Sequence, residues 1–325
     1  MAKKEFWLGM LALVLAFGMM VVGCPEEEEI VLPTGPKWTM VANPPFGIGR
    51  IKDIAYGDGK FIAVGFSSSN SRIAYSTDGV NWVLINNLSA YIYPDAIAYG
   101  GGKWVTDDSY STDGLNWIAG TSTLRINSPK IVYGNGKFLA IGEQNKIAYS
   151  TDGQSWVDVS NPPFITDSNP DYINDIAYGD GKFIVVGGNK IANSTDGTNW
   201  RSVSPTLFGD MIIDHIAYGN GKFVASNWNA MAYSMDGINW RSVNGKEKGN
   251  GWGFDYNKFD CIAYGNGKWI ALRSTWGLGY SSDGINWTPA FNPPNLSFPR
   301  KIIYGDGKFV VLGGGSDGGI AYSIQ

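Results

Sequence analysis

The sequence predicts an all-β fold: a seven-bladed β-propeller with four antiparallel strands per blade and an N-terminal strand that closes the last blade. Three observations predict it. The phrase (I/V)-(A/V/I)-Y-G-x-G-K-(F/W) occurs seven times, and S-x-D-G-x-x-W follows it in the first six units. The seventh unit lacks the second phrase, whereas the chain near residue 38 begins with the end of one. A period near 40 residues with four strands per unit is typical of propeller blades.

The first phrase predicts a β-hairpin in every unit. Its tyrosines are separated by 43, 34, 45, 40, 46 and 40 residues. Between two β-rich runs stand Gly-Asp-Gly or Gly-Asn-Gly, and these residues tolerate the positive φ of a tight hairpin turn. The second copy has Gly101 at the central position, which permits the same turn. The tyrosines that mark the seven units are Tyr56, Tyr99, Tyr133, Tyr178, Tyr218, Tyr264 and Tyr304.

The second phrase predicts another turn. In it the Asp carboxylate accepts hydrogen bonds from the backbone amides of the same turn, and Gly adopts a φ that other residues rarely adopt. We expect the Trp to bury its ring beside the next blade. S-x-D-G-x-x-W resembles the Asp-box, or BNR repeat, of the sialidase-like β-propellers, and the resemblance covers residues 38–325. It implies a structural turn between the third and fourth strands, away from the ligand face. We therefore interpret six acids as fold residues and not as metal ligands: Asp78, Asp113, Asp152, Asp196, Asp236 and Asp283.

The seventh unit predicts how the ring closes. It provides three strands and stops at Gln325 without a Trp-led fourth strand. Trp38 stands at the start of the domain, and Val41–Phe46 (VANPPF) resembles 159–164 (VSNPPF) in the third unit. We expect the strand around Trp38 to be the fourth strand of the seventh blade, so that the ring has no open edge.

Residues 1–23 resemble a bacterial lipoprotein signal peptide. Lys3 and Lys4 precede an apolar run from Phe6 to Val22, which is short for a membrane span, and Gly23 directly precedes Cys24. This resemblance implies cleavage before Cys24 and lipid attachment to it. An ordinary secretory signal and an uncleaved anchor are the alternatives. Residues 24–37 then form an acidic tether, and the expected location is the bacterial cell envelope, facing the periplasm or the cell surface.

The charge and the cysteines exclude two kinds of protein. The whole chain carries −4, of which residues 1–29 contribute −3, so the remainder carries only −1. A domain without a basic footprint is not expected to bind nucleic acid. With Cys24 lipidated, Cys261 has no partner within the chain, so no disulfide framework is expected. No cofactor or metal is predicted, and we expect a monomer.

Recognition is expected on the face opposite the hairpins and Asp-boxes, where the longer loops gather. The fifth and sixth units concentrate aromatic residues there, which suit a sugar ring or a peptide side chain. The alternative is that these aromatics form small cores within their own loops. The candidate ligand-binding residues are Trp228, Trp252, Phe254, Tyr256, Arg273 and Trp276. Tyr91, Tyr93 and Tyr172 stand on other loops of the same face.

One ring position provides a second, weaker candidate. The residue before the first strand's Ile is Asp53, Ala96, Lys130, Asp175, His215, Cys261 and Lys301 in the seven units. Asp175, His215 and Cys261 fall on neighbouring blades, and such side chains can hold a metal or activate a thiol. A polar channel rim without a function is the alternative.

These patterns favour a lipid-anchored binding or scaffold module with a glycan or protein ligand. A glycoside-acting enzyme of the sialidase-like class is the alternative. Against it, the chain has only seven Arg, lacks a Phe-Arg-Ile-Pro phrase and, beyond the leader and tether, has only Glu143 and Glu247 as glutamates. Hydrolysis of a glycoside usually needs paired carboxylates.

Overall fold

The computed structural model describes residues 35–47, 49–67, 70–86, 88, 92–120, 126, 129–164, 172–203, 206–227, 230–243, 259–273, 277–290, 294–296, 298–313 and 319–324. All of them belong to the second of two compact units, Thr34–Gln325. Cys24 and the whole leader lie outside the described residues.

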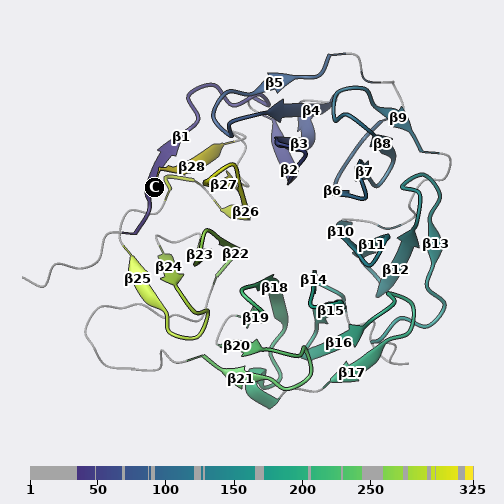
Figure 1. Cartoon of the computed structure of the whole chain (residues 1–325), viewed down its shortest axis with the longest axis vertical. Helices are drawn as coiled ribbons and strands as arrows, with labels where there is room; N and C mark the ends of the chain where they lie inside the picture. Colours follow the sequence, from purple (N-terminus) through teal and green to yellow (C-terminus); the bar gives the residue numbers. More distant parts are fainter. Residues whose placement is uncertain are drawn as a thin grey trace, which may run out of the picture. The chain divides into compact units, whose positions relative to one another are not determined.

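Within this unit, seven four-stranded antiparallel sheets are arranged in a ring (Figure 1), which confirms the predicted propeller. Each sheet runs from an inner first strand to an outer fourth strand. The blades are β2(Arg50–Gly57), β3(Lys60–Ser67), β4(Asn70–Ser76), β5(Val83–Leu84); β6(Ile97–Gly100), β7(Lys103–Thr106), β8(Ser109–Ser111), β9(Ile118–Ala119); β10(Lys130–Gly134), β11(Lys137–Gly142), β12(Lys146–Ser150), β13(Val157–Asp158); β14(Asp175–Gly179), β15(Lys182–Gly187), β16(Lys190–Ser194), β17(Arg201–Val203); β18(Ile213–Gly219), β19(Lys222–Asn227), β20(Met231–Ser234), β21(Arg241–Ser242); β22(Cys261–Gly265), β23(Lys268–Arg273), β24(Gly277–Ser281), β25(Thr288–Ala290); and β26(Pro299–Gly305), β27(Lys308–Gly313), β28(Ile320–Ile324), β1(Lys37–Met40).

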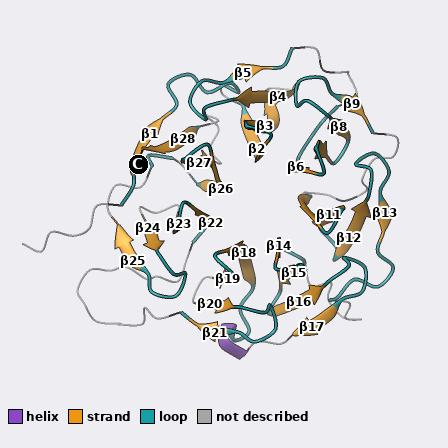
Figure 2. Ribbon diagram, in the orientation of Figure 1, coloured by secondary structure: helices purple, strands orange, loops and turns teal. Residues whose placement is uncertain are grey.

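Helix contributes little to this fold. Figure 2 shows strands joined by loops, and among the described residues the helical structure is the 3₁₀ turn η1(Thr206–Phe208), near β21. In the described part of the chain, no helix has the length and apolar character needed to cross a membrane.

The N-terminal strand closes the seventh blade, as predicted. β1 pairs with β28 in antiparallel register, with Trp38 opposite Ser323. The amide of Val41 then donates to the carbonyl of Ile320 at 2.8 Å. In the third blade Val159 donates to Ile147 in the same way, also at 2.8 Å. The start of the domain therefore replaces the fourth strand and exit loop that the last unit lacks.

The first-to-second-strand turns have the conformation that their Asp-Gly and Asn-Gly pairs predict. Asp58 and Gly59 have φ of 45° and 69°, and Asn135 and Gly136 have 45° and 75°. Two successive positive φ values are the requirement of a type I′ hairpin turn.

A tyrosine of every blade packs onto a glycine of the preceding blade. A Cβ atom on Gly134 would lie 2.2 Å from the ring of Tyr178, and one on Gly305 would lie 2.3 Å from the ring of Tyr56. The same contact recurs in all seven units, and the last one joins the seventh blade to the first. The Tyr-Gly dipeptide of the repeat therefore makes an interface between blades, because only Gly leaves room for the ring.

The tryptophans of the second phrase pack in the opposite direction from the prediction. Trp200 of the fourth blade lies against a cluster that includes Leu139 and Ile141 of the third blade. Trp82 of the first blade lies against a cluster that includes Val310 of the seventh. Each of these two rings is therefore partly buried at the junction with the preceding blade and not with the next one.

Candidate binding site at the mouth of the central channel

The described residues form a cavity at the centre of the ring, with a volume of about 290 Å³. All seven blades contribute to its lining, at the N-terminal ends of their first strands. This end lies opposite the hairpins and the Ser-x-Asp-Gly turns. Those two sets of turns share a face, because Lys137 of one hairpin donates to the carbonyl oxygen of Asp196 in the next blade at 2.9 Å.

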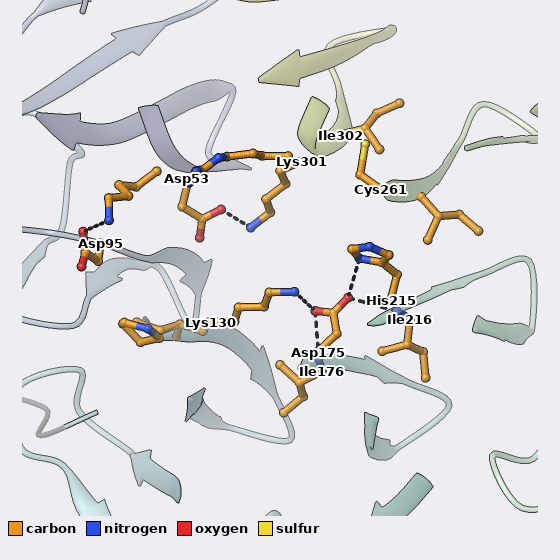
Figure 3. A pocket seen from close by; sticks show the side chains of 15 residues that line it. Asp53, Asp95, Lys130, Asp175, Ile176, His215, Ile216, Cys261, Lys301 and Ile302 are labelled. Carbon is orange, nitrogen blue, oxygen red and sulfur yellow. Dashed lines mark hydrogen bonds and ion pairs between the residues drawn. The ribbon is translucent and has the colours of Figure 1, made fainter. Parts of the chain in front are cut away.

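The cavity has a charged rim and an apolar floor, and Figure 3 shows side chains from several blades converging on it. The rim carries Lys52, Asp53, Asp95, Lys130, Asp175, Arg300 and Lys301, with His215 and Cys261. Five isoleucines follow ring positions in blades three to seven and form the floor: Ile131, Ile176, Ile216, Ile262 and Ile302. Six of the seven ring positions identified in the sequence line this cavity. In the second blade Asp95 lines it in place of Ala96.

Asp53 ties the first blade to both of its neighbours. The residue is buried, at 6% exposure. Oδ1 accepts the amide of Ile54 at 2.8 Å, and Oδ2 accepts the amide of Ile97, in the second blade, at 3.0 Å. Lys301 of the seventh blade donates its Nζ to Oδ1. The carboxylate is therefore held at the junction where the two ends of the repeat meet.

Asp175 makes the same set of contacts on the other side of the ring (Figure 3). It accepts the amides of Ile176 and Ile216, each at 3.0 Å, and its Oδ1 lies 2.9 Å from Nζ of Lys130. Blades three, four and five are joined in this way. In both places the Lys belongs to the preceding blade and the amide to the following one, so both acids serve the packing of blades.

His215 and Cys261 do not form an activated pair with Asp175. Nδ1 of His215 lies 4.0 Å from Oδ2 of Asp175. Burial, with the charge of Lys130, lowers the pKa of His215 to about 4, so the imidazole is neutral at pH 7. Burial, with the charge of Asp260, raises the pKa of the Cys261 thiol far above its ordinary value. No group of three or more potential metal ligands occurs among the described residues.

Two of the cations reach the rim from β-bulges. In β2 the register shifts between Ile51 and Asp53, and in β26 it shifts between Pro299 and Lys301. The extra residues are Lys52 and Arg300. A bulge turns a side chain away from the alternation of its strand. Lys52 then lies 3.2 Å from Asp95, whereas no carboxylate of the described residues is in ion-pair contact with the exposed Arg300.

The six acids of the second phrase engage their own turns. In the second blade, Asp113 lies in the turn after the third strand, β8. Its Oδ1 accepts hydrogen bonds from the backbone amides of Leu115 and Asn116, both at 2.8 Å, and from the hydroxyl of Ser111 at 2.9 Å. The Asn116 side-chain amide donates to Oδ2 at 2.7 Å. These bonds, the Asn116 amide first, lower the pKa of Asp113 far below its ordinary value. The Ser-to-Asp contact and the amide bonds recur in the other five copies, at Asp78, Asp152, Asp196, Asp236 and Asp283.

The aromatic candidates fall largely outside the described residues. Trp228, Trp252, Phe254, Tyr256 and Trp276 are not described. Arg273 is described at the end of β23, where it is half-buried and does not line the central cavity. On other loops, Tyr93 and Tyr172 are exposed, at 61% and 53%.

The sequence contains a signal for the contacts that Asp53 and Asp175 make between blades. At the ring positions a Lys directly precedes an Asp twice around the circle, as Lys130 before Asp175 and as Lys301 before Asp53. Neighbouring opposite charges indicate a pair between blades. Arg300 carries no such signal, because a bulge cannot be recognised from one strand alone.

Comparisons with solved structures show the same class of fold. The chain is similar to YCF48 bound to a D1 peptide, at 15% identity and a TM-score of 0.67, over 90% of this chain and 99% of that one. It is also similar to a catalytically inactive virginiamycin B lyase from Staphylococcus aureus with quinupristin, at 12% identity and a TM-score of 0.69, over 90% and 100% of the two chains. The WD40 β-propeller domain of Doa1 matches at 13% identity and a TM-score of 0.61, over 89% and 97%.

These likenesses define the chain as a seven-bladed β-propeller. No protein-family model matches it, and no curated protein matches it in sequence.

Proposed function

We propose that this chain is a lipid-anchored binding module outside the cytoplasm, whose glycan or protein ligand docks over the face on which the central cavity opens. The observation that carries the proposal is the cavity itself, which takes lining residues from all seven blades. A propeller of similar fold holds a peptide, which is consistent with a protein ligand.

The contacts of the rim favour binding over catalysis. Each of the three carboxylates on the rim is in contact with a Lys, and two of them also accept two backbone amides. Acid–base catalysis needs a carboxylate or imidazole that can exchange a proton near neutral pH. His215, with a pKa lowered to about 4, does not provide one.

The test is a binding screen run beside an activity screen. The purified chain is applied to a glycan array and a peptide array, and in parallel to a panel of glycoside conjugates with chromogenic leaving groups. Binding that protects residues around the cavity from hydrogen exchange, without product release, supports the proposal. Release of a sugar product would replace it with the glycoside-acting alternative.

The lipid anchor is a separate part of the proposal and needs its own test. Cys24 follows an apolar run and a small residue, the arrangement that lipoprotein signals share. Cys24→Ser should abolish incorporation of labelled fatty acid and release the protein from the membrane fraction, with Cys261→Ser as the control that leaves both unchanged. Membrane association that survives Cys24→Ser would favour an uncleaved anchor.

A further inference from the structure

We propose that the central cavity binds the C-terminal residue of a peptide, with the chain-end carboxylate at Arg300 and the last side chain on the isoleucine floor. This inference rests on the proposed binding function and specifies the chemistry of the group that enters the cavity.

The charge of the rim suits a single negative charge. Four cations and three carboxylates line the cavity. Every carboxylate is paired with a Lys, so the surplus belongs to Arg300. His215 is neutral at pH 7 and does not add to it. A carboxylate would balance this surplus, and it matches the planar fork of a guanidinium. A phosphate group, with about −1.5 to −2, would not be balanced.

The backbone before Arg300 is arranged in an unusual way. Arg300 is the extra residue of a bulge, and bulges are common beside functional sites because they re-aim a side chain. Two residues earlier, Phe298 has φ of 50° and is 66% exposed. A positive φ is rare for a bulky residue. Arg300 lines the cavity directly after this segment, whereas Phe298 is not part of the lining.

The floor of the cavity is apolar and open on one side. The five isoleucines that line it keep 4% to 9% exposure. Their counterparts in the first two blades, Ile54 and Ile97, are closed off at 0% and 1%. A volume of about 290 Å³ corresponds to roughly ten water molecules, which leaves room for one amino-acid residue and a few waters. An apolar floor below a cationic rim therefore fits one apolar residue that ends in a carboxylate.

Four pools of fluorescein-labelled hexapeptides test this assignment by fluorescence anisotropy with the full-length chain in detergent. The first pool ends in leucine with a free carboxylate, and the second ends in leucine amide. The third ends in serine with a free carboxylate. The fourth is amidated and carries an internal glutamate, which distinguishes a side-chain carboxylate from a chain end. We expect the first pool to bind about tenfold or more tightly than each of the others.

Variants then locate the contact. Arg300→Gln should weaken binding of the first pool about tenfold, and Arg300→Lys should weaken it less because the charge remains. Arg241→Gln, on the exposed outer strand β21, is the matched control and should leave binding unchanged. Arg300 is exposed, and thermal melting checks that every variant is folded.

The outcomes separate this inference from the proposed function. Three results would overturn the chain-end assignment without contradicting the proposed binding function. They are equal binding of the free and amidated leucine pools, tighter binding of the internal-glutamate pool, and binding of the first pool that Arg300→Gln does not change. Binding to the glycan array with no peptide binding would also overturn it. Sugar turnover without any binding partner would remove both proposals.

Discussion

At the scale of single residues, the two buried carboxylates on the rim connect chemistry to architecture. Asp53 and Asp175 each accept hydrogen bonds from backbone amides of two different blades. Each also pairs with a Lys of a third blade. Removing such a group leaves buried N–H donors without partners, and each unsatisfied donor costs about 1–3 kcal/mol.

We expect Asp53→Ala and Asp175→Ala each to lower the free energy of unfolding by roughly 2–4 kcal/mol. Asp210→Ala is the control, because Asp210 is exposed and has no structural contact of this kind. Urea unfolding followed by tryptophan fluorescence measures all three. If Asp53→Ala has the same urea midpoint as the Asp210→Ala control, the Asp53 carboxylate does not stabilise the contact between blades.

Asp107 predicts a pH dependence of stability. Burial, with the charge of Asp108, raises its pKa to about 7, while the amides of Asp95 and Ala96 donate to it at 2.9 and 3.1 Å. Asp108 is the acid whose charge acts on Asp107, and Asp95, which is paired with Lys52, acts in the same way on Asp108. A folded-state pKa above the unfolded value contributes stability at low pH that is lost as the pH rises toward 7.

Asp107→Asn keeps the acceptor oxygen and removes the charge. The variant should therefore gain stability relative to the wild type between pH 5 and pH 8, by roughly 2 kcal/mol. Melting temperatures across that range measure it, and Asp210→Asn should show no such trend. If the stability difference between Asp107→Asn and the wild type is the same at pH 5 and pH 8, the pKa of Asp107 is not raised.

At the scale of elements, the contact of tyrosine on glycine makes every hairpin part of an interface. Gly134→Ala would place a methyl group 2.2 Å from the ring of Tyr178, and overpacking of this kind costs about 1–3 kcal/mol. In the Tyr178→Ala background the same change should cost less than about 0.5 kcal/mol, because the obstacle is gone. A double-mutant cycle by chemical unfolding provides the coupling, and additive effects would contradict the interface.

The N-terminal strand is the second element with a testable role. Deletion of residues 37–42 removes β1 and Trp38, which packs on the core cluster of the sixth and seventh blades, and it leaves β28 as an open edge. We expect the melting temperature to fall by ten degrees or more, as a loss of several kcal/mol implies. Deletion of Glu26 to Glu29 is the control and should not change it. Unchanged melting after loss of β1 would rule out closure by this strand.

Much of the fold could be predicted because the repeat spells out its turns and strands. The phrase around Tyr133 predicts a hairpin by its residue types alone, and Trp38 predicts the closing strand because it completes an otherwise truncated unit. The direction in which Trp200 packs could not be predicted, since a strand pattern does not say which neighbouring blade faces a side chain. The ring position of His215 follows from repeat register, but its loss of basicity depends on burial.

The cavity was only partly predictable for the same reason. Side chains alternate along a strand with a period of two, so a single bulged residue changes which ones face the channel. Arg300 and Lys52 reach the rim through such bulges, and Asp95 takes the place expected of Ala96. The aromatic candidates Trp252 and Tyr256 lie outside the described residues and stay predictions.

At the scale of the whole domain, the last unit lacks one covalent turn. Ser323 lies opposite Trp38, at the two positions that a Ser-x-Asp-Gly-x-x-Trp turn joins in the other blades, but no such turn connects them here. Backbone cyclisation that joins Ser323 to Trp38 through Thr-Asp-Gly-Ile-Asn should complete a seventh copy. Closing a chain of this length removes unfolded-state entropy worth roughly 5–6 kcal/mol.

The cyclised domain should therefore melt at a higher temperature than the linear one, as differential scanning calorimetry can measure. A Gly-Ser linker of equal length is the control and should give a smaller gain, since it lacks the turn's own hydrogen bonds. A cyclised domain that melts at or below the linear temperature would mean that the two ends are not arranged as a hairpin.

The pairing of β1 with β28 also sets an order in time. β1 precedes the other described strands in the sequence, and its partner β28(Ile320–Ile324) follows them, so the ring can close only when both are available. Until then the apolar faces through which the first and seventh blades pack on each other stay uncovered, and exposed apolar surface favours association with other chains. Association with other chains is therefore expected to be most frequent in the interval before β1 and β28 pair.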